Sequence, residues 1–425
     1  MPRLSPHLVR RAQHINCHLP ILLRECRDLS SARNELRWMQ EAIEEKHTRQ
    51  SNTSEPGRQQ EISRKIEIQL THWIKRRTRH EPLQYILGTT PFGELELKCR
   101  PGVLIPRVDT ETWVAMLGES LRRWYNVAGN NSNSKSDSTK RQGLRIADFC
   151  TGSGCISLLL HSILKSPCAG SSSGQRSKIE VYGFDVSPQA LALSQENLEH
   201  NIGLEALHPS ARYDVSFHNL DVLKLSRQSP SAIRCTLNTV TKAGSATSAQ
   251  PVFDVIVSNP PYISPSTFRS TSSAVTRYEP LLALVPPPLI PQTATTIDTN
   301  INADMDALQA DQFYPALTHL ALSVNAKLLV LEIGDSEQAL RVVHACMHLY
   351  RAHHKLSSSD ASRSRNRDGG SDDLDARFEV WGDCGTTQSF ASLRAGFDEE
   401  EFRPRAVVMW LDDRWMRDVR AGDRL

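Results

Sequence analysis

Residues 144–160 combine an apolar run, a glycine-rich turn and a helix, and this order leaves few folds open to the chain. The run Leu144-Arg145-Ile146-Ala147 is typical of a buried strand, and the turn from Asp148 to Gly154 leads into the helix. Glycines at such a junction let the backbone approach a ligand closely and expose the N–H groups that begin the helix. We therefore expect an α/β domain whose ligand site lies beyond the carboxyl end of this strand.

Further strand-length apolar runs follow and predict the rest of the sheet. They are 181–185, 215–217, 253–257 and 327–333, with 378–381 and 406–410 as a final antiparallel pair. Together they predict a Rossmann-like mixed sheet of seven strands. The second run ends in Asp185, an acid suited to bind two ribose hydroxyls. Ser157 stands where a nicotinamide-dinucleotide fingerprint requires its third glycine, so the turn by itself does not identify the ligand.

Asn219-Leu220-Asp221-Val222 follows the third of these runs. Asp221 is placed to accept a hydrogen bond from an adenine amino group. An ordinary turn at a strand end explains the same residues equally well, and the sequence leaves both readings open.

A stiff corner, Ser258-Asn259-Pro260-Pro261-Tyr262, follows the run at 253–257. The prolines fix φ, cannot donate hydrogen bonds, and push Asn259 into an extended conformation. Asn259 and the neighbouring carbonyl then offer a rigid pair of acceptors beside the ring of Tyr262, an arrangement that suits a planar –NH2 group. A purely structural Pro-Pro turn is the competing interpretation.

Composition argues against several other classes of protein, and only weakly against nucleic-acid binders. A formal net charge of +2 over 425 residues is unlike the strongly basic surface of a protein that mainly binds nucleic-acid phosphates. The nine cysteines are scattered without a C-x-x-C pair, which favours reduced thiols over a zinc site or a disulfide framework. No apolar run reaches the roughly 18 residues of a membrane span, so we expect a soluble protein without metal.

The first 88 residues predict a small helical domain. Its first 24 residues contain arginines and no acid, as in mitochondrial targeting segments. Against this reading, Pro2, Pro6 and Pro20 interrupt a targeting helix. The alternative is that the segment is the first helix of the mature protein. The basic run 75–80 has two readings, contact with RNA or an acidic partner, or a solvated helix end.

Between this domain and the sheet, residues 89–111 predict a hairpin linker with its turn at Pro101-Gly102. The catalytic domain then spans 112–425. Five polar stretches in it predict disordered insertions: 126–142, 166–177, 226–250, 286–310 and 357–375.

Several motifs together resemble a known family. The D-x-x-x-G-x-G turn, the acid after the second strand and NPPY after the fourth resemble class I S-adenosyl-L-methionine-dependent methyltransferases that act on planar nitrogens. The blocks E-P-L-Q-Y-I-L-G, G-V-L-I-P-R, N-P-P-Y-I-S and R-Y-E-P-x-x-A-L, which begin at residues 81, 102, 259 and 277, resemble the HemK-type release-factor glutamine methyltransferases. The resemblance covers all but the insertions.

The resemblance implies a role for each matching residue. The cofactor loop falls on Cys150, Thr151, Gly152, Ser153 and Gly154, with Asp185 on the ribose, Asp221 and Val222 on the adenine side, and Asn259 beside the cofactor. Asn259, Pro260, Pro261 and Tyr262 become the substrate clamp, in which Asn259, Pro260 and Tyr262 are catalytic.

The sequence departs from the family pattern at two places. Relatives often have glycine at the position of Cys150 and an aromatic residue near Val222, which weakens the expected packing around adenine. The usual P-R-P-E-T-E reads Pro106-Arg107-Val108-Asp109-Thr110-Glu111, which loses a proline and keeps an acid.

The implied activity is N5-methylation of the glutamine in the Gly-Gly-Gln loop of a peptide chain release factor, by a self-sufficient monomer of the mitochondrial branch. Membrane association and stable nucleic-acid binding are not expected. NPPY is shared with adenine N6-methyltransferases of DNA and RNA, which would flip a base into the same clamp, so this activity is the alternative. A non-catalytic binding module of the same fold is a third possibility.

Overall fold

The computed structural model describes residues 3–50, 58–130, 143–165, 178–241, 251–289, 299–357, 374, 376–383, 385–390, 392 and 402–422. The chain divides into two compact units. A smaller unit comprises residues 1–90, 99–101 and 271–279, and a larger unit comprises 91–98, 102–270 and 280–425.

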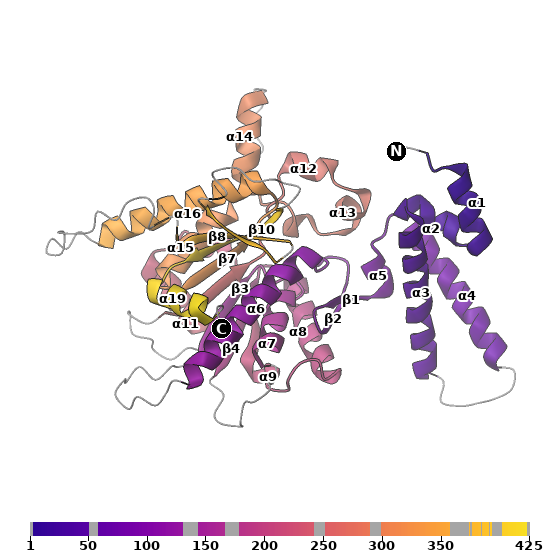
Figure 1. Cartoon of the computed structure of the whole chain (residues 1–425), viewed down its shortest axis with the longest axis horizontal. Helices are drawn as coiled ribbons and strands as arrows, with labels where there is room; N and C mark the ends of the chain where they lie inside the picture. The colour runs from indigo at the N-terminus through magenta and orange to yellow at the C-terminus, as the bar shows by residue number, and fades with distance from the viewer. Residues whose placement is uncertain are drawn as a thin grey trace. The chain divides into compact units, whose positions relative to one another are not determined.

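The larger unit (Figure 1) is built on a mixed sheet. The strand order of this sheet is β5-β4-β3-β6-β7-β10-β8-β9. Its strands are β3 (Leu144–Phe149), β4 (Ile179–Asp185), β5 (Val215–Asn219), β6 (Val255–Ser258), β7 (Leu328–Glu332), β8 (Phe378–Gly382), β9 (Thr387–Ser389) and β10 (Pro404–Trp410). The first five pair in parallel, and β10 pairs antiparallel to both β7 and β8. The sheet therefore reverses direction at β10, as the sequence predicts for the final pair.

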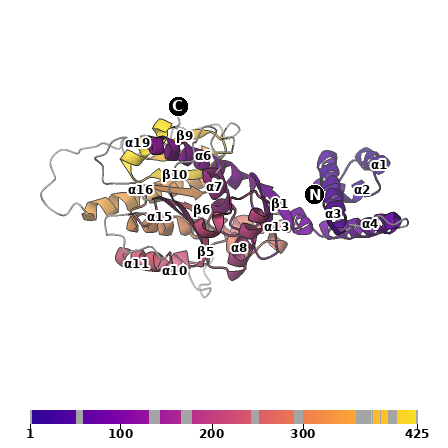
Figure 2. The same ribbon diagram turned by 90° about the horizontal axis from the view of Figure 1, so that it is seen from below.

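Helices cover both faces of this sheet, and Figure 2 shows the layers from the side. One face packs against α6 (Val108–Asn130), α7 (Cys155–Lys165), α8 (Pro188–Gly203) and α19 (Asp413–Gly422). The other packs against α10 (Val222–Leu225), α11 (Pro230–Val240), α15 (Phe313–Ser323) and α16 (Ser336–Ser357). Successive residues of a strand point to opposite faces, so Val255 and Val257 of β6 join the first core and Ile256 joins the second. Strands buried on both faces explain the nearly continuous apolar runs in the sequence.

The smaller unit is helical. It contains α1 (Pro6–Ile15), α2 (Leu19–Cys26), α3 (Leu29–Gln50), α4 (Arg58–Arg77), α5 (Leu83–Leu87) and α13 (Ser273–Tyr278). Its core joins apolar side chains of the first helices, including Ala12, Leu22 and Leu23, to Trp73 of α4. Residues 12–23 are thus part of this packed unit. The described helix α13 joins it from a distant part of the chain, because the Tyr278 hydroxyl donates to the carbonyl of Arg79 at 3.0 Å.

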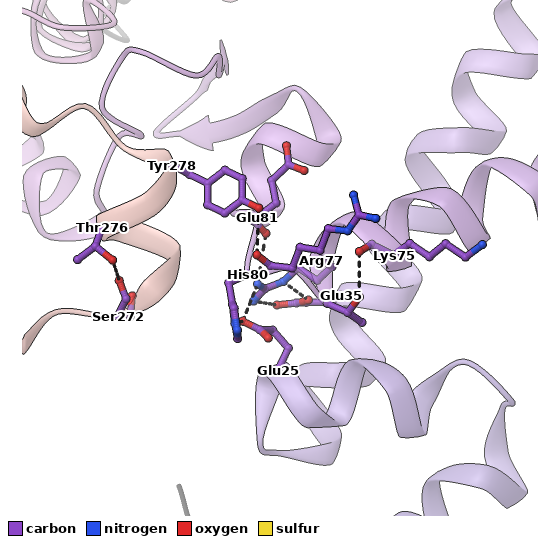
Figure 3. Close-up of polar contacts among 11 residues, drawn as sticks. Glu25, Glu35, Lys75, Arg77, His80, Glu81, Ser272, Thr276 and Tyr278 are labelled. Carbon is purple, nitrogen blue, oxygen red and sulfur yellow. Dashed lines mark hydrogen bonds and ion pairs between the residues drawn. The ribbon is translucent and has the colours of Figure 1, made fainter.

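Two arginines of the basic run at the end of α4 pair with acids of the smaller unit, and Figure 3 shows the pairs of Arg77. The Arg77 guanidinium donates to both carboxylate oxygens of Glu35, at 2.9 and 3.0 Å, and to Glu25 at 3.2 Å. Arg76 makes a two-point ion pair with Glu81, at 2.6 and 2.9 Å. Arg76 and Arg77 thus hold the helices of their own unit together, whereas Lys75 and Arg79 are exposed, as the reading of a solvated helix end expects. Contact of the run with RNA or an acidic partner stays a prediction.

Arg77→Leu is expected to lower the free energy of unfolding of the chain by about 2–3 kcal/mol, because it leaves two mostly buried carboxylates without their shared cation. The Arg77, Glu25 and Glu35 side chains are each only 13–14% exposed. Arg37→Leu is the control, since Arg37 is 61% exposed and pairs with Glu41 at 3.6 Å on the same helix. Chemical denaturation of both variants measures the difference, and equal midpoints would contradict a stabilising role for Arg77.

Two expectations about the sheets are corrected. The sheet has eight described strands and not the seven expected. The additional strand, β9, is not predictable from the sequence because it is short, polar and at the edge of the sheet. The hairpin consists of β1 (Thr89–Phe92) and β2 (Leu95–Lys98), so its turn lies at Gly93-Glu94 and not at Pro101-Gly102. Gly93 has φ of +57°, which a tight hairpin turn requires. Residues 103–105 form no strand; Val103 instead packs on α8.

The predicted insertions are partly helical. Helix α11 lies inside 226–250, where Ser229 caps its first turn and Ile233 and Leu237 are buried. Helix α14 (Thr299–Ala310) lies inside 286–310, and α6 extends to Asn130. Disorder is therefore the wrong prediction for these residues. The remaining parts, 131–142, 166–177, 242–250, 290–298 and 358–373, lie outside the described residues.

Among the described helices, none combines the length and the apolar character needed to cross a membrane.

Candidate active site

A cavity of about 440 Å³ in the larger unit brings most of the predicted site residues together. Its lining includes Cys150, Thr151, Gly152, Ser153, Asp185, Asp221, Val222, Asn259 and Pro261. These residues follow β3, β4, β5 and β6, whose carboxyl ends meet at one edge of the sheet. The glycine turn and the NPPY corner therefore open onto one space. Of the other predicted residues that the structure describes, Gly154, Pro260 and Tyr262 do not line it.

The turn after β3 has an unusual backbone. Cys150 has φ of +61°, Gly152 of +56° and Gly154 of +82°, all in the left-handed region. A side chain at Gly154 would come within 3.0–3.3 Å of Ser194 and Phe217, so this position needs glycine on two counts. The left-handed φ at Cys150 is one that glycine adopts without strain.

Asp148 holds the turn from below. Its Oδ2 accepts hydrogen bonds from the hydroxyls of Thr151 and Ser157, at 2.6 and 2.7 Å. Complete burial raises the pKa of Asp148 to about 7, and these two hydrogen bonds oppose that shift. Ser157, which stands where a nicotinamide-dinucleotide fingerprint has its third glycine, is therefore a structural partner of Asp148.

Cys150→Val is expected to lower the free energy of unfolding by about 1–2 kcal/mol, because a β-branched side chain disfavours the left-handed backbone. Cys150→Gly should stay within about 0.5 kcal/mol of the parent, since relief of the backbone offsets the loss of a partly buried thiol. Thermal and denaturant unfolding of the pair measures the order. Equal stability of the two variants would show that φ at this residue is not under strain.

Asp185 is aimed by the backbone around it. Its Oδ2 accepts from the Gly152 N–H and its Oδ1 from the Ser187 N–H, both at 2.9 Å. Burial raises the pKa of this carboxyl, and the same backbone hydrogen bonds oppose the rise. Each oxygen keeps a further lone pair for a ligand hydroxyl.

The region next to Asp185 supplies an apolar wall. Leu220, Val222 and Phe313 all line the cavity. Phe313 begins α15, far from Val222 in sequence, and it supplies an aromatic ring in the cavity wall where the sequence lacks one near Val222. Asp221 caps α10 by accepting from the Lys224 N–H at 3.0 Å, so the turn reading holds for one of its oxygens.

The NPPY corner is fixed at both ends. The Ser258 hydroxyl donates to the carbonyl of Phe149 at 2.7 Å, which ties β6 to the end of β3. Asn259 Nδ2 donates to Thr110 Oγ1 at 3.2 Å. The Tyr262 hydroxyl donates to Glu332 Oε1 at 3.3 Å, and burial raises the pKa of this hydroxyl well above its usual range. Tyr262 is partly buried against the core, so its expected stacking on the substrate stays a prediction.

Sequence reasoning missed two residues that contact this corner, Thr110 and Glu332. Thr110 lies in the first turn of α6, and Glu332 ends β7 at the ligand-binding edge of the sheet. Burial raises the pKa of Glu332 to about 7, against the hydrogen bonds that it accepts from Trp113, Thr110 and Tyr262. An acid at a strand's carboxyl end was the available signal.

Comparisons with known proteins agree with this geometry. A family model described as PrmC N-terminal domain matches residues 57–88, and one described as N-6 DNA Methylase matches 135–288. The chain is 32% identical over 288 residues to the mitochondrial MRF1 N(5)-glutamine methyltransferase MTQ1 of Saccharomyces cerevisiae, covering 67% of this chain and 68% of that protein. It is 29% identical over 286 residues to the probable MRF1 mitochondrial N(5)-glutamine methyltransferase mtq1 of Schizosaccharomyces pombe, covering 67% and 73%.

Bacterial relatives match over a shorter part. The release factor glutamine methyltransferase of Haemophilus influenzae is 32% identical over 226 residues, which cover 53% of this chain and 60% of that protein. Among solved structures, the human methyltransferase 10 domain containing protein covers 73% of this chain and 86% of its own at 13% identity, with a TM-score of 0.33, a likeness too distant to bear on the activity. On the identity to the yeast protein and the length that it spans, the chain belongs to the release factor glutamine methyltransferases, the S-adenosylmethionine-dependent enzymes that methylate a protein glutamine.

Proposed function

We propose that this chain methylates N5 of the glutamine in the Gly-Gly-Gln loop of a mitochondrial peptide chain release factor. The observation that carries the proposal is the single cavity shared by Asn259, Asp185 and the glycine turn. The names of the two yeast relatives support the substrate and the mitochondrial location. We further propose that the enzyme acts as a monomer without stable nucleic-acid binding.

The residues of the cavity fit S-adenosylmethionine. Its volume of about 440 Å³ lies in the range typical of small-molecule sites. A side chain at Gly152 would meet no atom within 4 Å, so the glycine leaves open space in the wall. Asp185 would accept from the ribose hydroxyls, and Leu220, Val222 and Phe313 would pack on the adenine. Asp221 is the candidate acceptor for the adenine amino group.

When bound, S-adenosylmethionine supplies an activated methyl group on a sulfonium. The remaining task of the protein is to present a poor nucleophile, because the lone pair of an amide nitrogen is delocalised into its carbonyl. Asn259 Oδ1 and the Pro260 carbonyl would each accept one hydrogen of the substrate –NH2. Positioning of this kind supplies up to roughly 7–11 kcal/mol.

The acceptors also stabilise the transition state. A carbon–nitrogen bond forms as the carbon–sulfur bond breaks, and positive charge develops on the nitrogen between the two acceptors. The nitrogen then loses a proton to water, and S-adenosylhomocysteine leaves. No dedicated base is needed if the proton departs after the methyl transfer.

The test uses the full chain with methyl-labelled S-adenosylmethionine and, in parallel reactions, a mitochondrial release factor, DNA and RNA. Label on the Gly-Gly-Gln glutamine, located by peptide mass mapping, is the expected result. A Gln→Ala change in the loop of the factor should abolish it. Label in nucleic acid with a steep salt dependence would instead establish adenine methylation.

A further inference from the structure

Glu332 connects the two polar side chains of the NPPY corner. Its Oε1 accepts from the Tyr262 hydroxyl at 3.3 Å. Its Oε2 accepts from Trp113 Nε1 at 2.8 Å and from Thr110 Oγ1 at 2.7 Å. Thr110 Oγ1 in turn accepts a hydrogen bond from Asn259 Nδ2 at 3.2 Å. A hydrogen-bond relay therefore runs from Trp113 through Glu332 and Thr110 to Asn259, and Trp113, Thr110 and Glu332 are each at most 2% exposed.

The chemistry of the donors gives this relay one direction. The indole N–H of Trp113 can only donate, and Glu332 as a carboxylate can only accept, so Oε2 of the ionised Glu332 accepts from both of its partners. The Thr110 hydroxyl then donates its single hydrogen to Oε2 and keeps only lone pairs for Asn259. Asn259 must meet those lone pairs with its –NH2.

The orientation of the Asn259 amide follows. A flipped amide would place Oδ1 against Thr110 Oγ1, two acceptors facing each other with no hydrogen between them. With Nδ2 held by Thr110, Oδ1 lies at the opposite edge of the planar amide, on a residue that lines the ligand cavity. Asn and Gln amides have nearly symmetric outlines, so their orientation is decided by such partners and not by packing.

We propose that Thr110 and Glu332 are positioning residues that lock the Asn259 amide with its oxygen toward the substrate. The role in turnover rests on the proposed function, whereas the lock itself is a property of the protein without substrate. The Thr110 hydroxyl and the Glu332 carboxyl are buried, and a buried polar group left without a partner is costly, which strengthens the lock.

Thr110→Val tests the lock, since valine keeps the size of threonine and removes its hydroxyl. We expect kcat for release-factor methylation to fall about 10- to 100-fold, because the freed amide spends part of its time flipped. The KM for the factor should stay within about twofold, because the reacting amide is a small part of the bound surface. Thr110→Ser restores the hydroxyl and should recover most of the lost rate.

The matched control is Thr112→Val on the same helix. The Thr112 hydroxyl donates to the Val108 carbonyl at 3.2 Å, at the exposed side of α6. This variant should retain wild-type turnover. Thermal unfolding of all three variants checks that each is folded, and a KM–kcat split separates positioning from general destabilisation.

A second readout is independent of any substrate. In protein labelled with ¹⁵N-asparagine, the two side-chain N–H signals of Asn259, assigned by their loss in Asn259→Ala, report its hydrogen bond. We expect the N–H that is bonded to Thr110 to exchange slowly with water in the wild type and in Thr110→Ser, and at least tenfold faster in Thr110→Val.

Unchanged signals and unchanged kcat in folded Thr110→Val would overturn the proposal. If the wild type methylates no release factor, the proposed function fails, while the Asn259 signals still decide whether the lock exists.

Discussion

Asn259→Ala is expected to lower kcat for glutamine methylation by about 10³-fold while the Kd for S-adenosylmethionine stays within a few-fold of the parent value. The alanine removes the acceptor that we propose meets the substrate where charge develops, and loss of one such preorganised group costs about 10²–10³ in rate. Cofactor affinity is expected to survive because Asp185 and the apolar wall of Leu220, Val222 and Phe313 are untouched.

Single-turnover kinetics with saturating cofactor measures the rate, and calorimetry measures the affinity. Asn34→Ala is the control, since Asn34 is exposed on α3 of the smaller unit. A near-normal rate for Asn259→Ala would refute the clamp. Parallel losses of rate and affinity would instead assign Asn259 to cofactor binding.

Asp185→Ala is expected to raise the Kd for S-adenosylmethionine by about 100-fold. The carboxylate is held by the Gly152 and Ser187 N–H groups, so in its proposed role it would meet the ribose hydroxyls without reorganising. Hydrogen bonds to a charged group contribute about 1.5–3 kcal/mol each, and tenfold in Kd corresponds to about 1.4 kcal/mol. The kcat at saturating cofactor should fall much less.

Asp221→Ala is the comparison for this experiment. Asp221 also lines the cavity, but one of its oxygens caps α10 and its side chain is 31% exposed. We expect a Kd increase of about tenfold or less. Calorimetric titration of S-adenosylhomocysteine into each folded variant measures both values. A larger effect at Asp221 than at Asp185 would show that the ribose is held elsewhere.

The sequence predicts those elements whose pattern lies in consecutive residues, and it misses those that depend on contacts with distant parts of the chain. The strands around Val181 and Val255 were predictable because strands buried on both faces are continuously apolar. Strand β9 was not, because Thr387–Ser389 carries no apolar signal and forms only by pairing with β8. Helix α11 was hidden by its serines and threonines, although Ser229-Pro230 is a regular helix start.

The same division applies to the site. The glycine turn, Asp185 and Asn259 each stand at the end of a strand, so sequence order alone places them at one edge. Thr110 and Glu332 are not predictable from the sequence, because their role depends on a hydrogen bond between residues that are 222 positions apart. The positive φ of Cys150 likewise follows from the turn and not from the residue type.

The membership of α13 in the helical unit affects how this enzyme can be dissected. The chain leaves the larger unit after residue 270, a few residues beyond Tyr262, and re-enters it at Pro280, which lines the cavity. A truncation that removes residues 1–90 would therefore leave residues 271–279 without the unit on which they pack. The Tyr278 hydroxyl would also lose its acceptor, the Arg79 carbonyl. A shortened catalytic fragment of this protein would need a redesigned bridge there, and loss of activity in a simple truncation would say nothing about which unit recognises the substrate.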